Sequence, residues 1–384
     1  MSAAHGRMGA NPFDRSPAMP FADELLGAEH AAELLRIAEA TLGRRPEALA
    51  AAESKLAPLA LRERADLLRD ALLADAPAGY LALARVVRDA AADPALTGWM
   101  IWPVLGAVAQ RAVEDGGHDA FDDAMALQAE LTGRLTAEFS IRPLLRHDPD
   151  RGLAIMLGWT DHPDEHVRRL ATEGSRPFLP WGLRVPALVA RPEATLPILD
   201  ALVRDESEYV RRSVANHLND LSRDHAGLVV ATAAGWLERP EATTPALVRH
   251  ALRTLVKRGD PAALALLGFA PASIEVDGPV LDAASVPMEG SIGFTAELRN
   301  TGAEPARLAV DYVVHHRKAN GATTTKTFKL TTATLAPGER MRVDRRHAFR
   351  TITTRRYHLG EHAIALQVNG VTTEPARFEL VAAQ

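Results

Sequence analysis

The chain has 384 residues, of which 47% are apolar and 24% charged, enough for two or three domains with full cores. It contains no cysteine, which excludes a disulfide framework, a thiolate nucleophile and a cysteine-ligated metal. The formal net charge of −5 argues against a nucleic-acid partner, but the acidic excess is unevenly distributed. Residues 271–384 hold 14 Lys and Arg against 12 Asp and Glu, so all of the excess lies in residues 1–270.

Residues 1–20 lack the apolar core of a signal peptide, and no apolar run in the chain approaches the roughly 18 residues of a membrane span. We therefore expect a disordered leader over residues 1–20, no membrane partner and a cytoplasmic location. We also expect a monomer.

Residues 21–268 show helical periodicity in nearly every segment, which predicts an all-α region. Proline, glycine and Asp-Pro pairs separate the amphipathic stretches. The clearest of these stretches are 22–26, 31–42, 61–73, 80–90 and 121–135.

One helical pattern occurs three times at intervals of 43 and 38 residues, beginning at Val167, Val210 and Val248. A period near 40 with paired helices is typical of HEAT-like repeats, so we expect a helical repeat solenoid. The middle copy has an apolar stripe, and its other face is polar with Asp220 at the border. The stripe consists of Val210, Val214, Leu218 and Leu221, and the polar row of Arg212, Asn216, Asn219 and Arg223.

Aligning the three copies places equivalent residues in two rows across neighbouring helices. The first row contains Arg169, Arg212 and His250. The second contains Glu173, Asn216 and Thr254.

The pattern changes at Pro271, after which apolar and polar residues alternate. Asn-Gly and Pro-Gly pairs mark turns between the alternating stretches. About seven short strands over residues 271–384 predict an all-β immunoglobulin-like sandwich, although the paired cysteines of antibody domains are missing. The expected fold class is thus mainly α, a HEAT-like solenoid over 21–268 followed by the sandwich.

Glu138 is the first candidate for chemistry. On a continuous helix it falls on the apolar line, with Arg134 and Arg142 one turn away on either side. One interpretation is a short ion-pair ladder at the end of a helix. The other is a carboxylate held by arginines at the mouth of a cleft, where it stays ionised.

Trp181 ends a loop that Pro177 and Pro180 stiffen. A single tryptophan after a loop more commonly fills a core, but this one also suits stacking on, or cation–π contact with, a positively charged base. Arg169 and Glu173 form an i, i+4 pair, which is most often a surface salt bridge.

Other chemistries lack their sequence signals. The chain has no glycine-rich phosphate loop or dinucleotide fingerprint, and His315 and His316 point to opposite faces of a predicted strand. We find no metal-binding cluster and expect neither a metal nor a cofactor. Seven arginines between Arg340 and Arg356 form either a solvated surface or a phosphate-contacting one.

Three separate blocks carry a family resemblance: TAEFSIRP at 136–143, ATEGSRPFLPW at 171–181 and YVRRSVANHLND at 209–220. Together they resemble the DNA alkylation repair glycosylases of the AlkC type, which are relatives of AlkD within a HEAT-like repeat superfamily. The resemblance covers roughly residues 20–268. Some AlkC-type proteins also have a C-terminal immunoglobulin-like domain, which is similar to the arrangement predicted here.

The resemblance implies a monofunctional enzyme of base excision repair that hydrolyses the N-glycosyl bond of N3-alkylated bases, such as 3-methyladenine and 3-methylcytosine, in double-stranded DNA. Lys55 and Lys257 are the only lysines of the helical region and lie outside the three blocks, so Schiff-base strand cleavage is not expected. The implied roles are as follows. Glu138 and Asp220 act on the sugar and water with Glu173 in support, Trp181 contacts the base or sugar, and Arg169, Arg176, Arg212, Arg345 and Arg346 bind phosphates.

Two alternatives remain open. One is a DNA-structure-binding repeat protein without catalysis, and the other is a protein-interaction scaffold. The carboxylates and Trp181 argue against the first, and the arginine row argues against the second.

Overall fold

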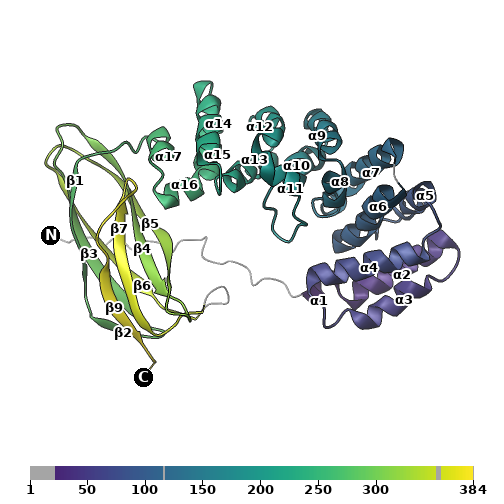
Figure 1. Cartoon of the computed structure of the whole chain (residues 1–384), viewed down its shortest axis with the longest axis horizontal. Helices are drawn as coiled ribbons and strands as arrows, with labels where there is room; N and C mark the ends of the chain where they lie inside the picture. The colour runs from purple at the N-terminus through teal and green to yellow at the C-terminus, as the bar shows by residue number, and fades with distance from the viewer. Residues whose placement is uncertain (1–21, 116, 352–355, 384) are drawn as a thin grey trace, which may run out of the picture. The chain divides into compact units, whose positions relative to one another are not determined.

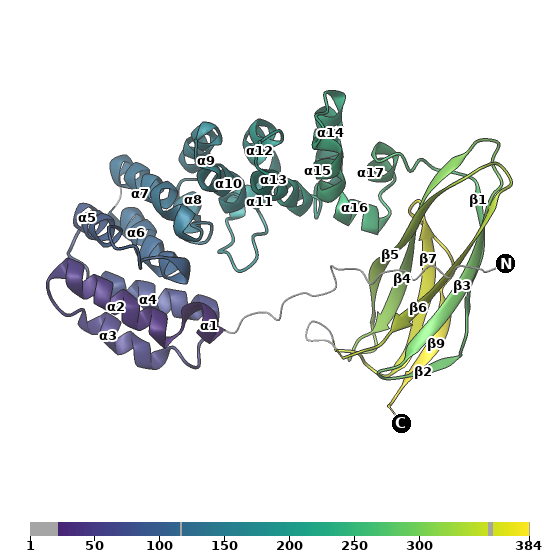
Figure 2. The ribbon, with the colours of Figure 1, turned by 180° about the vertical axis from the view of Figure 1, so that it is seen from behind.

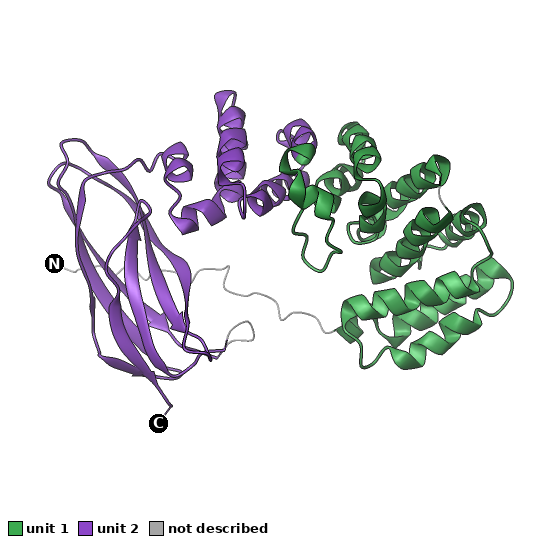
Figure 3. Cartoon of the chain, viewed as in Figure 1, with its two compact units in different colours: residues 1–195 green, residues 196–384 purple. Residues whose placement is uncertain are grey.

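The computed structural model describes residues 22–115, 117–351 and 356–383, so the predicted leader over residues 1–20 lies outside the described residues. The chain forms two compact units, residues 1–195 and residues 196–384 (Figure 3). The change from helix to strand falls inside the second unit, between Leu266 and Ile274. The predicted fold class, helical repeats followed by a β-sandwich, is confirmed (Figure 1).

The first unit contains helices, turns and loops, and no strand, in its described residues. Its long central helix α6 (Ile101–Asp115) packs against α4, α5, α7 and α8, and every side chain from Ile101 to Ala109 is buried. This helix is apolar on nearly all sides because neighbouring helices surround it. The other elements are α1 (Ala22–Leu26), α2 (Ala28–Leu42), α3 (Glu47–Ala52), η1 (Glu53–Lys55), α4 (Leu61–Asp75), α5 (Tyr80–Ala90), η2 (Gly98–Met100), α7 (His118–Leu131), η3 (Thr132–Arg134), α8 (Arg142–His147), α9 (Pro149–Gly158), η4 (Trp159–Asp161), α10 (Glu165–Gly174), α11 (Pro186–Ala190) and η5 (Pro192–Thr195).

Helix α10 has its two ends fixed by local chemistry. Asp164 caps its first turn, because the Asp164 side chain accepts a hydrogen bond from the His166 N–H at 2.8 Å. At the other end Gly174 packs tightly, since a Cβ there would lie 3.0 Å from Ile141 and 3.2 Å from Met156. The chain then turns into the loop that carries Trp181.

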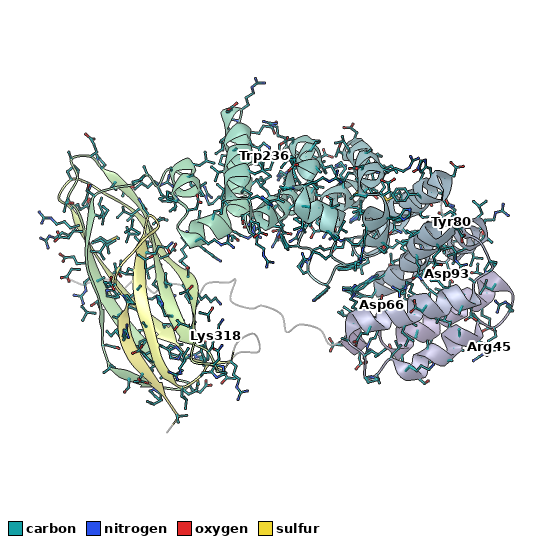
Figure 4. The ribbon with its side chains drawn as sticks, viewed as in Figure 1. Arg45, Asp66, Tyr80, Asp93, Trp236 and Lys318 are labelled. Carbon is teal, nitrogen blue, oxygen red and sulfur yellow. The ribbon has the colours of Figure 1, made fainter. Side chains whose placement is uncertain are left out.

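The second unit begins with six helices. In α13 (Glu208–Leu221) the side chains of Val210, Val214, Leu218 and Leu221 are all buried, which confirms the predicted apolar stripe. Trp236 of α14 donates from Nε1 to Asp200 of α12 at 2.7 Å, and Figure 4 labels this tryptophan. The other helices are α12 (Leu196–Leu202), α14 (Ala226–Glu238), α15 (Thr244–Ala251), α16 (Arg253–Arg258) and α17 (Pro261–Leu266). None of the described helices, in either unit, is long and apolar enough to cross a membrane.

The sandwich has two sheets, which are visible from both sides in Figures 1 and 2. One sheet has the order β1-β3-β6, and the other has the order β2-β9-β7-β4-β5 with β8 beside β7. All pairs are antiparallel except β2 with β9. The strands are β1 (Ile274–Leu281), β2 (Ser285–Pro287), β3 (Ser291–Asn300), β4 (Ala306–Arg317), β5 (Thr323–Leu335), β6 (Arg340–Ala348), β7 (Gly360–Val368), β8 (Val371–Thr372) and β9 (Ala376–Val381).

Alternating residues of both sheets fill the core between them, including Phe294, Val314 and Ile364. The predicted turn at Asn369 and Gly370 joins β7 to β8, and both residues have positive φ, 44° and 86°. Asn-Gly is the pair that such a tight hairpin favours.

The same hairpin holds the sandwich to the last helices of its unit. Asn369 donates from Nδ2 to the carbonyl oxygens of Ala270 at 2.8 Å and Arg307 at 3.0 Å. Gly370 lies directly against Gly259, at the end of α16, and a Cβ on either glycine would clash with the other's backbone. The last helices therefore pack with the sandwich in one compact unit.

Candidate active site

Glu138 lies in a turn between η3 and α8, so the prediction that it sits on a continuous helix is wrong. The helical stretch predicted over 121–135 ends at Leu131 and a 3-10 turn follows. Arg134 and Arg142 are therefore not one helical turn from Glu138. Arg134 donates to the carbonyl oxygens of Asp93 at 3.1 Å and Leu96 at 2.9 Å, and Arg142 to that of Leu183 at 2.7 Å.

The carboxylate of Glu138 is buried, with the residue only 8% exposed, and two groups contact its Oε2 atom. Arg169 Nη2 lies 2.9 Å away, and the Thr136 hydroxyl donates to it at 2.8 Å. The expected arginine partner therefore exists, but it comes from α10. Arg169 is far from Glu138 in the sequence, so the spacing of residues around Glu138 does not indicate it as a partner.

Glu173 brings a second carboxylate to the same place. It is buried on α10, its Oε1 forms an ion pair with Arg176, and Arg169 Nη2 lies 3.8 Å from the same oxygen. The Arg169–Glu173 pair was expected at the surface, and this is wrong, because both side chains are largely buried. We call Glu138, Arg169, Glu173 and Arg176 the carboxylate network.

The network balances opposing effects on ionisation. Burial raises the pKa of Glu138 above its ordinary value, the positive charge of Arg169 opposes that rise, and the negative charge of Glu173 adds to it. Because a buried charge is costly unless it is paired, Arg169 is what allows an ionised Glu138 in this position.

Trp181 does not fill a core. It is 50% exposed, and its φ of 61° places it in the left-handed region, where a bulky side chain is unusual. The loop around it is held by arginines, since Arg142 donates to the Gly174 and Arg176 carbonyl oxygens and Arg184 to that of Pro177. A rigid loop thus presents an indole to solvent.

A row of aromatic rings connects Trp181 with the Glu138 segment. The ring centroid of Trp181 lies 6.3 Å from that of Trp99, which stacks at 6.2 Å on Phe139. Phe139 stacks in turn on Trp102 at 4.4 Å. Sequence reasoning missed Trp99 and Trp102 because neither lies in a motif block, whereas Phe139 stands next to Glu138 in the first block.

Trp102 and Phe139 also form one wall of a cleft of about 320 Å³ in the first unit. Other residues of α6 and residues of α4 complete the lining, with Asp66 (labelled in Figure 4) and Arg69 among them. These two side chains form an ion pair at 2.5 Å. These two charged groups of the cleft are thus already paired with each other.

In the second unit, Arg212 and His250, two of the three residues of the first predicted row, line one pocket between α13 and α15. Burial, together with the positive charges of Arg253 and Arg212, lowers the pKa of His250. Arg212 is exposed. The row of Asn216 and Thr254 is shifted, since Asn216 Oδ1 lies 3.0 Å from His250 Nε2, and Asn219 accepts from the Thr254 N–H at 3.2 Å.

Asp220 lies half-buried in the last turn of α13. The site residues of the sandwich lie on β6, an edge strand of the three-stranded sheet. Arg345 is exposed, and so is Arg346, which is paired with Asp282 at 2.7 Å. Among the described residues, no group of His, Asp or Glu is arranged to hold a metal ion.

Comparisons with known proteins place the chain in a family. Residues 275–382 match the family model described as "Uncharacterised protein YhaZ, C-terminal Ig-like domain". The chain is 34% identical over 324 residues to the uncharacterized protein YhaZ of Bacillus subtilis (strain 168), covering 84% of this chain and 88% of that protein.

A solved structure is also similar over nearly the whole chain. It is the Pseudomonas fluorescens alkylpurine DNA glycosylase AlkC bound to DNA containing an abasic site analog. The TM-score is 0.82 at 35% identity, and the match covers 94% of this chain and 100% of that one. Sequence and structure agree over both the helical region and the sandwich, and the chain therefore belongs to the AlkC family of helical-repeat proteins with a C-terminal immunoglobulin-like domain.

Proposed function

We propose that this protein is a DNA glycosylase of alkylation repair, which releases N3-alkylated bases such as 3-methyladenine and 3-methylcytosine from double-stranded DNA. The observation that carries the proposal is the match, over 94% of this chain, to a glycosylase solved on DNA with an abasic site analog. A buried carboxylate network and an exposed tryptophan, which a row of aromatic rings connects to the Glu138 segment, support it, because such groups suit a cationic substrate.

The reaction does not require a strong general acid. A base alkylated at a ring nitrogen is cationic, so the bond between sugar C1′ and base breaks with its electron pair leaving on the base, which becomes neutral. The sugar develops oxocarbenium character, and a water oxygen adds to C1′ as a proton is released. The enzyme must chiefly stabilise the cationic sugar and admit the water.

Glu138, in the first unit, is assigned the role of stabilising the cationic sugar. Its carboxylate is shielded from bulk water, and a charge acts more strongly in such surroundings than in solvent. Glu173 supports it indirectly by binding Arg169 and Arg176. Trp181 presents an accessible indole face for a cationic base.

Asp220, in the second unit, is proposed as a further carboxylate acting on the sugar or water. The proposal for it rests on the third motif block and on its half-buried position in α13. We propose that the enzyme acts without a metal or a cofactor.

Phosphate contacts are proposed for the arginines of both units. Arg212 and Arg345 are exposed, which suits binding to the DNA backbone, and Arg346 is exposed although it is paired with Asp282. Arg169 and Arg176 bind carboxylates in this structure, so a phosphate contact of theirs would be made beside these ion pairs.

The test is base release. Purified protein is incubated with methylated duplex DNA in EDTA, and free bases are separated and quantified by mass spectrometry. We expect 3-methyladenine to be released and the strand to stay intact until the abasic site is cleaved by alkali. DNA binding without any release would favour the non-catalytic DNA binder, and failure to bind DNA would favour the protein scaffold.

A further inference from the structure

Thr136 lies two residues before Glu138, and its hydroxyl contacts three groups that define the position of the Glu138 carboxylate. The Thr136 oxygen lies 2.8 Å from Glu138 Oε2, 3.2 Å from the Glu138 backbone nitrogen and 3.5 Å from Arg169 Nη1. Thr136 therefore contacts both the residue and its arginine partner.

The donor and acceptor roles of these contacts follow from the groups themselves. The backbone N–H of Glu138 and the guanidinium of Arg169 can only donate, so they occupy the two acceptor positions of the hydroxyl. A hydroxyl has a single proton, and the remaining partner for it is Glu138 Oε2. All three contacts of the Thr136 hydroxyl are therefore hydrogen bonds when Glu138 Oε2 acts as an acceptor.

Arg169 alone would hold Glu138 less firmly. Its side chain is long, and the same Nη2 atom lies near both Glu138 and Glu173. Thr136 is short, and it links the carboxylate of Glu138 to the backbone nitrogen of the same residue. This local bracket restricts the rotation of the Glu138 side chain further than the shared guanidinium does alone.

We propose that Thr136 is a positioning residue of the base-release reaction, whose hydroxyl fixes the Glu138 carboxylate as a hydrogen-bond acceptor and ties it to the backbone nitrogen of the same residue. The inference rests on the proposed function, because it assigns Thr136 a part in that reaction. Thr136 itself touches neither the base nor the sugar in this role.

The proposal has a consequence for pH dependence. The charged groups that face Glu138 are Arg169 and Glu173, both from α10. Burial and Glu173 raise the pKa of Glu138, and Arg169 and the Thr136 hydrogen bond lower it. Removing the hydroxyl must raise this pKa further, so the acidic limb of the rate profile moves to higher pH.

The experiment compares Thr136→Val, Thr136→Ser and the control Thr160→Val. Thr160 is a threonine of η4 in the same unit, whose hydroxyl donates to the Leu157 carbonyl oxygen at 2.7 Å. Single-turnover release of 3-methyladenine is measured from pH 5 to pH 8, roughly the range in which a raised carboxyl pKa is visible. Affinity for the same DNA is measured in parallel.

We expect Thr136→Val to release base about tenfold more slowly at neutral pH, with unchanged DNA affinity and an acidic limb at higher pH. Thr136→Ser keeps the hydroxyl and should match the wild type, as should Thr160→Val. A Thr136→Val protein with the wild-type rate and profile would overturn the proposal. So would a Thr136→Ser protein as slow as Thr136→Val, because packing and not the hydroxyl would then be responsible.

A second measurement does not depend on activity. Carbon-13 NMR of carboxyl-labelled protein, with Glu138→Gln to assign the signal, follows the titration of Glu138 in folded wild type and Thr136→Val. A higher Glu138 pKa in the variant supports the positioning role even if no base is released, in which case only the proposed function fails. Identical titration curves overturn the positioning role whatever the activity.

Discussion

Arg169 and Glu138 form a buried ion pair, with 2.9 Å between Arg169 Nη2 and Glu138 Oε2. The pair joins α10 to the turn before α8, and Glu173 and Arg176 extend it on the α10 side. Through Glu173 and Arg176 it connects the first two motif blocks, although α9 lies between them in the chain. A charge paired in this way is held in place before substrate arrives, which is what stabilisation of a developing cation requires.

Replacing Glu138 by Gln should abolish most of the base release and leave DNA affinity nearly unchanged. The carboxylate charge is needed mainly as the sugar becomes cationic, and loss of one such group typically costs about 10²- to 10³-fold in rate. We expect Asp220→Asn to behave in the same way. Glu193→Gln, which removes an exposed carboxylate of η5, serves as the control. Full activity in both site variants, measured under single turnover, would overturn the assignment.

Arg212→Ala should weaken binding to damaged and undamaged DNA by similar factors. Arg212 is exposed, and a phosphate contact carries no sequence or lesion information. Losing one contact should flatten the dependence of log affinity on log salt by about one unit. Fluorescence anisotropy across a salt series measures this slope. Arg204→Ala is the matched control, because Arg204 already has Glu241 as a partner at 3.6 Å. If Arg212→Ala has the same salt dependence as the wild type, Arg212 does not contact a phosphate.

The double variant Arg345→Glu with Arg346→Glu tests the sandwich as a second DNA-binding arm. We expect weaker DNA binding and slower excision at physiological salt, since two positive charges near the phosphates are reversed. Arg377→Glu is the control, because Arg377 lies on β9, outside the basic run, and pairs with Glu361 at 3.1 Å. Equal affinity and rate in the wild type, the double variant and Arg377→Glu would mean that these arginines form only a solvated surface.

Charge reversal is a sharper test than deletion of the sandwich. A chain cut near Gly268 would lose contacts of its last helices, because Gly259 lies against Gly370 and Asn369 binds the Ala270 carbonyl oxygen. Deletion therefore exposes a packed surface of the last helices. A defect in the shortened chain would mix lost DNA contacts with lost stability, and thermal unfolding of the double variant separates the two.

Gly370→Ala should destabilise the second unit more than Gly321→Ala. Both glycines have positive φ, 86° and 79°, so both substitutions carry a backbone cost of about 1 kcal/mol. Only at Gly370 does the added Cβ meet backbone, that of Gly259, whereas nothing lies within 4 Å at Gly321. The extra cost at Gly370 should be about 1–3 kcal/mol. Chemical denaturation of the two variants gives the difference, and equal stabilities would mean that the glycine contact is not tightly packed.

Asp311 should make stability depend on pH. Burial raises its pKa to about 6, although Lys329 and Lys257 oppose the rise. Between the ordinary value of 3.8 and about 6, the folded protein holds a proton that the unfolded chain releases. Stability should therefore fall as pH rises through that window and then level off.

Asp311→Asn removes this titration, so its stability should lack that slope and exceed the wild type at neutral pH by about 1–2 kcal/mol. Denaturant unfolding at several pH values measures both quantities. Asp344→Asn makes the same change of charge at an exposed position of β6 and serves as the control. A slope that survives in Asp311→Asn would assign the titration to another group.

The sequence by itself determined the elements and the family. The stripe of Val210, Val214, Leu218 and Leu221 predicted the buried face of α13, and alternation after Pro271 predicted the sandwich. These patterns are reliable because helix and strand impose their own periods on whichever face is buried. The three motif blocks indicated the AlkC family because each block is a continuous stretch of sequence, which can be recognised without the tertiary structure.

The tertiary structure alone decided the partners of the site residues. Spacing placed Glu138 on a helix between Arg134 and Arg142, whereas the chain leaves the helix at Leu131 and Glu138 pairs with Arg169. A single tryptophan after a loop more commonly fills a core, yet Trp181 is 50% exposed. Which side chains meet depends on how helices far apart in sequence pack and where loops close, and local periodicity contains no information about either.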